Sequence, residues 1–129
     1  MIGGDAVLIQ SYRDLLVWQE GMDVVVLSYR LASKLPSDEL YGLTSQIRRA
    51  SVAIPANIAE GAGRDHIGDY IRHLSIASGS LIELETHMLI AERLSYLGPD
   101  ETACLLKQTE ELGRMLKSLI RKLKARKSH

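Results

Sequence analysis

The sequence contains no Phe, and aromatic residues make up only 5% of its 129 positions. β-Sandwiches and β-barrels depend on aromatic and β-branched side chains, so this composition argues against them. A core must instead be built from Leu, Ile, Val, Ala and Met, of which Leu, Ala and Met are good helix formers. The composition therefore favours an all-α fold, and the length suits one domain rather than two.

Cysteine is also scarce, because Cys104 is the single one in the chain. One cysteine excludes an internal disulfide and a Cys-rich zinc site. Since Cys104 is surrounded by apolar residues in the sequence, we expect it to be a small buried hydrophobic side chain. No run approaches the ~20 apolar residues of a membrane-spanning helix, and residues 1–10 lack the features of a signal peptide. We therefore expect a cytoplasmic protein that has no membrane partner.

Acidic residues are absent from Arg114 onward, where seven basic residues occur: Arg114, Lys117, Arg121, Lys122, Lys124, Arg126 and Lys127. The whole chain has 16 basic and 16 acidic residues, so the part before Arg114 has 9 basic residues against 16 acidic ones. Two interpretations remain open. The cations complement the dipole at a helix C-terminus and keep the protein soluble, or they form a surface that binds phosphate groups.

Motifs of catalysis and metal binding are missing as well. The Gly61-Ala62-Gly63 run lacks the further glycine, the strand and the lysine of a phosphate-binding loop. There is no Gly-x-Ser-x-Gly elbow, and the Glu-x-x-His pairs of a di-iron bundle do not occur. Helical spacing can bring together His66, Asp69 and His73, or Glu83 and His87, but polar helix surfaces produce such spacings by chance. We expect no catalytic site, metal, cofactor or small-molecule substrate.

Three breaks, at residues 34–38, 61–63 and 97–99, divide the chain into four helical segments. Pro36 disfavours helix at the residue before it, and Pro99 suits the first turn of a new helix. Capping side chains and a helix-ending glycine are expected at these breaks, namely Ser37 or Asp38, Asp65 and Gly98.

Apolar residues recur three and four apart within each segment, as they do on one face of a helix. The first segment has Leu15, Trp18, Met22, Val25, Val26 and Tyr29. The second has Leu43, Ile47, Ala50, Ile54 and Ile58. The third has the heptad seam Tyr70, Leu74, Ala77, Leu81, Leu84, Met88 and Ala91. The fourth has Leu105, Leu112, Leu116, Leu119 and Leu123, with Thr109 at one seam position.

The third segment carries further apolar residues outside its seam, which are Ile67, Ile71, Ile82 and Leu89. Its apolar stripe is therefore wide enough for a central helix or for packing against another subunit. Short connections favour antiparallel neighbours, so the predicted fold is an all-α, up-and-down antiparallel four-helix bundle. We divide the chain into a poorly ordered N-terminal extension (1–11), the bundle (12–124) and a basic C-terminal tail (125–129).

Pro55 lies in the middle of the second helical segment. There it removes one backbone hydrogen bond and clashes with the carbonyl of Ser51, which costs about 3 kcal/mol unless the fold uses the kink. Asn57 and Glu60 follow on the next turn. Their side chains either hydrogen-bond the backbone near the bend or contact a ligand or a second subunit.

Gly79, beside Ser80 in the third segment, costs about 1 kcal/mol in a helix relative to Ala. We therefore expect another helix to approach closely there, within the bundle or across a subunit boundary. Glu83 and Glu85 lie one turn on, and one interpretation pairs them with arginines of the second segment. A second interpretation leaves the arginines simply solvated. A third makes them phosphate contacts, with Arg48, Arg49, Arg64 and Arg72 as candidates beside Lys117, Arg121, Lys122, Lys124, Arg126 and Lys127.

Two runs, residues 46–51 (QIRRAS) and 54–61 (IPANIAEG), resemble a signature of a known family. Its members are four-helix-bundle proteins encoded in intervening sequences of bacterial large-subunit ribosomal RNA genes. Residues 74–86 (LSIASGSLIELET) match its second signature, and residues 94–97 (LSYL) resemble its usual close of the third helix. The resemblance extends over about residues 12–123.

The family includes the accessory protein of diversity-generating retroelements, which works with a reverse transcriptase and its RNA. The resemblance implies a four-helix bundle, commonly a homopentameric ring, with nucleic acid as the proposed partner. From their positions in the helical segments, we consider Pro55, Asn57, Glu60, Gly61, Gly79, Ser80, Glu83 and Glu85 candidates for structural or interface roles. Residues 65–69 (DHIGD) depart from the more basic pattern of the family. We expect a non-enzymatic oligomer that binds RNA or a ribonucleoprotein. The alternative is a protein-binding scaffold or an accessory factor with no direct contact to nucleic acid.

Overall fold

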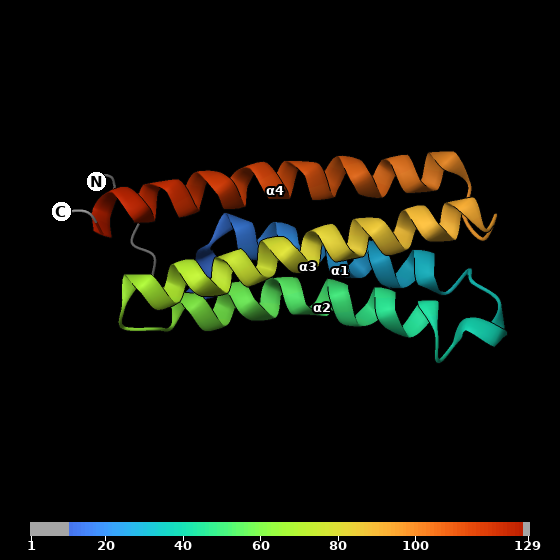
Figure 1. The fold of residues 1–129 in the computed structure, drawn as a ribbon, viewed down its shortest axis with the longest axis horizontal. Coiled ribbons are helices and arrows are strands. Elements are labelled where there is room, and N and C mark those ends of the chain that lie inside the picture. Colours follow the sequence, from blue (N-terminus) through green and yellow to red (C-terminus); the bar gives the residue numbers. More distant parts are fainter. Residues whose placement is uncertain (1–10, 128–129) are drawn as a thin grey trace.

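A computed structural model describes residues 11–127, and these residues form helices and connections without a strand. A short 3₁₀ helix, η1 (Tyr12–Asp14), precedes α1 (Leu16–Ala32), and a second one, η2 (Ser37–Glu39), precedes α2 (Leu43–Ala62). Then follow the two long helices α3 (Ile67–Arg93) and α4 (Pro99–Lys127) (Figure 1). The N-terminal extension expected at 1–11 lies outside the described residues except for Ser11, which caps η1.

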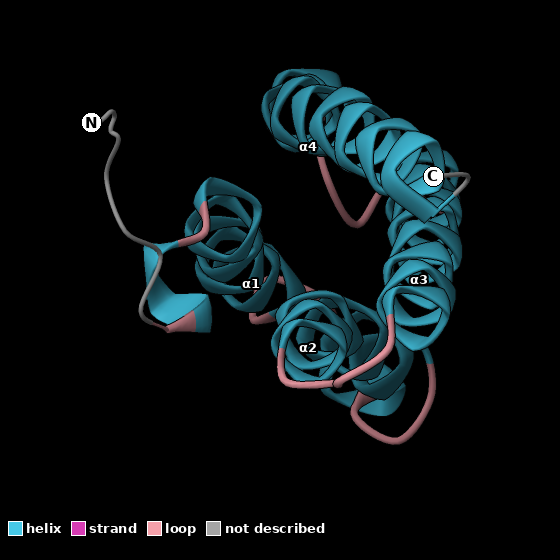
Figure 2. Ribbon diagram, turned by 90° about the vertical axis from the view of Figure 1, so that its left-hand side faces the viewer, coloured by secondary structure: helices cyan, strands magenta, loops and turns pink. Residues whose placement is uncertain are grey.

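The four helices pack in chain order around one core (Figure 2). Each helix contacts its sequence neighbours, and α4 closes the bundle against α1. Over residues 11–127 the diagonal pairs, α1 with α3 and α2 with α4, bring no two Cα atoms within 8 Å of each other. This arrangement confirms the up-and-down four-helix bundle. No helix within the described part of the chain is long and apolar enough to cross a membrane.

The core confirms the predicted faces of α2, α3 and α4. Most of the predicted residues are buried, and Leu43, Tyr70 and Leu119 lie half-buried at its edges. Thr109 is fully buried at its seam position, where its hydroxyl lies 2.6 Å from the Glu85 carboxylate and 3.1 Å from the Leu106 carbonyl. The buried hydroxyl therefore has the acceptors that a polar atom in a core needs.

The predicted face of α1 is wrong in part, although Leu15 and Trp18 pack against the core as predicted. Its buried residues are Val17, Gly21, Val24, Ser28, Leu31 and Ala32, whereas Met22, Val26 and Tyr29 are exposed. A Cβ at Gly21 would lie 3.5 Å from the Pro55 side chain, so the small residue lets α1 pack closely on α2. Both faces of α1 are apolar, and the face with the smaller side chains became the inner one.

Two predicted caps are also wrong. The backbone N–H of Leu43 donates to the Glu39 carboxylate at 3.1 Å, so neither Ser37 nor Asp38 caps α2. At α3, His66 occupies the N-cap position without a side-chain hydrogen bond, and Asp65 does not cap the helix.

The end of α3 differs from expectation as well. Ser95, not Gly98, has the left-handed backbone (φ 64°) just beyond the last turn. Its neighbour Tyr96 donates its backbone N–H to the carbonyl of Ala91 at 2.9 Å, which closes the helix end. Pro99 is the first residue of α4, as predicted.

Cys104 is exposed, contrary to the expectation that it is buried. The inner face of α4 follows Thr102, Leu105 and Thr109, and Cys104 falls outside this stripe. Apolar neighbours in the sequence of a helix are not neighbours on one face, because successive side chains point in different directions.

Candidate nucleic-acid interface

The basic half of α4 lies at the same end of the bundle as the α2–α3 turn (Figure 1). One contact documents this directly: Lys127 Nζ lies 3.4 Å from where a Cβ on Gly68, in the first turn of α3, would be. Arg64 and Arg72 flank the same turn and are exposed. We name this set the cationic end: Arg64, Arg72, Lys117, Arg121, Lys122, Lys124, Arg126 and Lys127.

The cationic end also contains acidic side chains. Glu60 accepts a hydrogen bond from Arg64 at 2.7 Å, one helical turn away. Asp65 is exposed in the turn, and Asp69 is half-buried in the first turn of α3. The carboxylate of Asp69 suits the positive end of the α3 dipole. The positive charge is therefore concentrated on α4 and on the arginines rather than spread over the whole end.

The opposite end of the bundle holds linked acidic groups. Lys34, just after α1, forms an ion pair with Glu101 of α4, and this hydrogen bond lowers the pKa of Glu101. The hydroxyl of Tyr96 donates to Glu39 at 3.0 Å, and this bond to a carboxylate raises the pKa of Tyr96. These contacts connect segments that are distant in sequence.

Arg48 and Arg49 do not belong to the cationic end. Arg64 lies just beyond the C-terminus of α2, and the stretch of α2 from Arg48 to Ala62 is about 21 Å long. The Arg48 guanidinium lies over the Tyr29 ring, 5.3 Å from its centroid, and its buried Nε has no hydrogen-bond partner among residues 11–127. The structure thus divides the predicted phosphate-binding residues into two groups.

Both arginines line a groove of about 720 Å³ beside α1 and α2. Its walls include Tyr29, Val52 and Tyr41, and Tyr41 is 94% exposed. No acidic residue lines this groove. It therefore combines apolar surface with two positive charges. Tyr41 was not predicted as a site residue, because it precedes α2 and belongs to no apolar repeat.

Glu83 and Glu85 have partners other than the arginines. Glu85 accepts the hydroxyl hydrogen bond of Thr109, and Glu83 lies 3.4 Å from the ring of His87. Arg49 and Glu83 border one small cavity, yet no ion pair joins either glutamate to Arg48 or Arg49 within residues 11–127. The expected Arg–Glu anchors are absent there.

Gly61 and Gly79, the two glycines among the candidate interface residues, have opposite surroundings. A Cβ on Gly61 would lie 2.7 Å from the Cβ of His73 and 3.1 Å from the Tyr70 ring, so α2 and α3 meet closely there. A Cβ on Gly79 would meet nothing within 4 Å, and Ser80 beside it is half-buried. The close approach expected at Gly79 therefore does not occur within the bundle.

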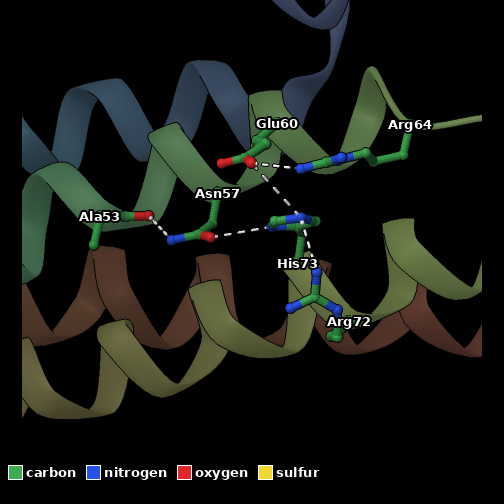
Figure 3. Close-up of polar contacts among 6 residues, drawn as sticks. All are labelled: Ala53, Asn57, Glu60, Arg64, Arg72 and His73. Carbon is green, nitrogen blue, oxygen red and sulfur yellow. Dashed lines mark hydrogen bonds and ion pairs between the residues drawn. The ribbon is translucent and has the colours of Figure 1, made fainter.

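A polar cluster joins α2 and α3 beside Gly61 (Figure 3). The side-chain amide of Asn57 donates to the carbonyl of Ala53 at 2.9 Å, so the helix after Pro55 gains a side-chain hydrogen bond. His73 is 5% exposed, and its ring lies 3.3 Å from the Asn57 oxygen and 3.9 Å from Glu60.

The same cluster includes residues of α3 that precede His73. The Arg72 guanidinium lies 3.5 Å from the ring, and burial raises the pKa of Tyr70 nearby. Sequence analysis considered His73 only as a metal ligand. Its position three residues after Tyr70 and directly before Leu74 places it at the inner face of α3, and this spacing was the available signal. Within the described residues, no group of three His, Cys, Asp or Glu side chains is placed to hold a metal ion.

Comparisons with known proteins agree with the four-helix fold and show the family of the chain. Among solved structures, a protein of unknown function from the S23 ribosomal protein family of Bacteroides thetaiotaomicron VPI-5482 superposes with a TM-score of 0.76 at 24% identity. The match covers 81% of this chain and 98% of that chain, and it shows the shared fold. No curated protein matches. The family model of the 23S rRNA-intervening sequence proteins matches residues 13–118. The chain therefore belongs to the 23S rRNA-intervening sequence protein family.

Proposed function

We propose that the protein is a non-enzymatic RNA-binding protein whose cationic end contacts the phosphates of structured RNA. The observation that carries this proposal is the meeting of three segments at one end of the bundle. Lys127 in the last turn of α4 lies against Gly68, which stands between Arg64 and Arg72 in the sequence. Each basic side chain that neutralises a phosphate releases a counterion, so such a surface binds RNA through charge and with little sequence selectivity.

We further propose that copies of the chain assemble, with the homopentameric ring of the resemblance as the expected form. Apolar side chains on the outer faces of α1 and α3 support assembly, among them Val26, Ile82, Leu89 and Leu94. Ile82 is 63% exposed in the single chain. A ring would bring several cationic ends to one face and thereby concentrate their positive potential.

The test is fluorescence anisotropy with a labelled RNA stem–loop, titrated at ~50 to ~200 mM salt. One variant replaces Lys117, Arg121, Lys122, Lys124 and Arg126 with Gln. At about 0.1 M salt, each lost phosphate contact weakens binding about eightfold, so the loss reaches the order of 10⁴-fold if all five cations contact phosphate.

A matched control replaces three exposed cations outside the cationic end, Arg30, Arg93 and Lys107, with Gln. We expect this variant to bind RNA like the unchanged protein. Equal losses in the two variants would refute a localised interface. Absence of binding by the unchanged protein at the lowest salt would refute the proposal itself.

A second candidate function is a protein-binding scaffold, or an accessory factor of an enzyme such as a reverse transcriptase. The groove of Tyr29, Tyr41, Arg48 and Arg49 favours it, because apolar walls with two positive charges suit a protein segment that carries carboxylates. Under this function, Tyr41→Ala together with Arg48→Gln abolishes partner binding, measured by calorimetry with the reverse transcriptase. The Gln substitutions on α4 leave that binding unchanged.

A further inference from the structure

His73 is a buried histidine among charged groups of two helices. It belongs to α3, and its ring faces Asn57 and Glu60 of α2 while Arg72 lies beside it (Figure 3). Glu60 is also the partner of Arg64. The two arginines that flank the α2–α3 turn are therefore both connected to one histidine, Arg72 directly and Arg64 through Glu60.

The hydrogen bonds determine which ring nitrogen carries the proton. The Ala53 carbonyl can only accept, so the Asn57 amide must direct its NH₂ group toward it, at 2.9 Å. This orientation leaves the Asn57 oxygen facing His73 Nδ1, at 3.3 Å. An oxygen acceptor requires Nδ1 to carry hydrogen, and Nε2 of the neutral ring then keeps its lone pair. Arg72, 3.5 Å from Nε2, can therefore donate to it.

Protonation of the ring reverses these preferences. Nε2 then carries hydrogen and positive charge, so it repels the Arg72 guanidinium and attracts the Glu60 carboxylate, which lies only 3.9 Å away. The oxygen of Glu60 that approaches Nε2 is the same one that accepts from Arg64. His73 and Arg64 therefore compete for it. Arg72 is then released from the ring. Arg64 must share with His73 the Glu60 carboxylate that neutralises its charge.

We propose that protonation of His73 opens a binding site for a phosphate group between Arg64 and Arg72. The ligand class is a tetrahedral oxoanion, and the RNA backbone is the source of that group if the proposed function holds. With the ring neutral, two arginines and Glu60 leave the cluster with one net positive charge. Protonation adds a second positive charge and weakens the contacts that hold both guanidinium groups. Arg is well suited to such a site because its planar fork binds phosphate through two hydrogen bonds.

The other titratable groups near the ring do not replace Glu60 in this role. Asp69 precedes His73 by one turn on α3, and no ion pair joins the two within the described residues. Tyr70 stays neutral over the range in which histidines titrate, because burial raises its pKa above the usual 10.0. The charged side chains that the structure records around the ring are those of Arg72 from α3 and Glu60 from α2.

The first experiment uses sulfate as the probe, because it remains a tetrahedral dianion throughout the range in which histidines titrate. Binding to the full chain is followed at about pH 8 and about pH 6 through the ¹³C-detected NMR signals of the Arg64 and Arg72 side chains. We expect sulfate to shift both signals at the lower pH with an affinity several-fold higher than at the upper pH. Equal affinity at the two pH values would overturn the proposal.

Two variants isolate the histidine and its carboxylate partner. His73→Gln removes the titrating ring, and we expect it to abolish the difference between the two pH values. Glu60→Gln changes a half-exposed residue, so folding is preserved, and we expect it to raise sulfate affinity at about pH 8 toward the low-pH level. The matched control is His87→Gln, which removes the other histidine of α3 that contacts a glutamate. A control that also abolished the pH difference would overturn the assignment to His73.

The second experiment repeats the RNA titration at the two pH values. Protonation adds about one phosphate contact, so RNA affinity at about 0.1 M salt rises about eightfold and the log–log salt slope steepens by about one. RNA binding without this difference between the unchanged protein and His73→Gln would refute the histidine site and leave the proposed function standing. Sulfate binding controlled by His73, with no RNA binding at either pH, would support the site and refute the proposed function.

Discussion

The two ends of the bundle use charged side chains in different ways. At the end opposite the cationic end, which we name the acidic end, Glu39 caps α2 and accepts a hydrogen bond from Tyr96. There Lys34 also forms an ion pair with Glu101 of α4. These contacts connect segments that are far apart in sequence. At the cationic end, the ion pair of Glu60 with Arg64 stays within one turn of α2. The charges therefore hold loops in place at one end, whereas at the other end Arg64 stays exposed to solvent.

The largest effect on stability is expected at the cationic end, where α2 and α3 meet at Gly61. Gly61→Leu forces a side chain into the space occupied by His73 and Tyr70, and we expect it to lower the free energy of unfolding by about 3 kcal/mol. Urea denaturation followed by circular dichroism measures the change. Gly63→Leu is the control in the same turn, since a Cβ there makes only ordinary contacts. Similar losses in both variants would contradict the close approach at Gly61.

At the acidic end, Glu39→Ala removes the cap of Leu43 and the acceptor of Tyr96 together. Loss of a helix cap costs about 1 kcal/mol, so we expect a decrease of about that size, which is smaller than for Gly61→Leu. Asp38→Ala is the control. It removes the adjacent carboxylate, which makes no side-chain hydrogen bond within residues 11–127. Equal destabilisation by both would mean that net charge, rather than these two contacts, stabilises this end.

Gly79 lies between the two ends, on the outer face of α3. A Cβ has open space there, so Gly79→Ala is expected to stabilise the single chain by up to about 1 kcal/mol through helix propensity. Gly79→Leu is expected to abolish assembly if a second subunit packs on this face. Analytical ultracentrifugation measures the assembly, and an unchanged sedimentation coefficient would place Gly79 outside any subunit interface.

The smallest effect concerns the pH dependence of the acidic end. The folded pKa of Glu101 lies below its usual 4.5, so the ion pair with Lys34 contributes stability above that value and loses it as the pH falls through the folded pKa. Tyr96 behaves in the opposite sense: its raised pKa contributes stability that is lost as the pH rises above 10.0. Denaturation of Glu101→Gln at neutral and acidic pH tests the first statement. The variant should lose less stability on acidification than the unchanged protein.

The fold followed from the sequence wherever one helix face dominates. The heptad seam of α3 became its buried face, and Pro99 began α4, because both signals act locally. The buried face of α1 could not be predicted from the sequence, because Val24 and Val26 belong to two faces that are similarly apolar. Only packing against Pro55, which favours the small residue Gly21, decides between those faces. Local patterns alone do not contain that information.

The candidate site was predicted in part. Antiparallel packing was enough to bring Arg64 and Arg72 to the basic end of α4, whereas Arg48 lies half a bundle away, although it is also in α2. His73 was missed because a polar residue on a long helix is usually exposed. Its burial depends on the close meeting of α2 and α3 at Gly61, which appears only when the two helices are placed side by side.

The short connections between successive helices also have a kinetic consequence. Contacts between elements adjacent along the chain close small loops, and proteins rich in such contacts fold quickly. Pairing of α2 with α3, the most extensive in the bundle, needs nothing that follows Arg93. During synthesis this hairpin, with Arg64, Arg72 and His73 in it, can form while the last helix is still being made. Most of the positive charge at the cationic end then arrives with the 29 residues of α4, after the surface on which they dock already exists.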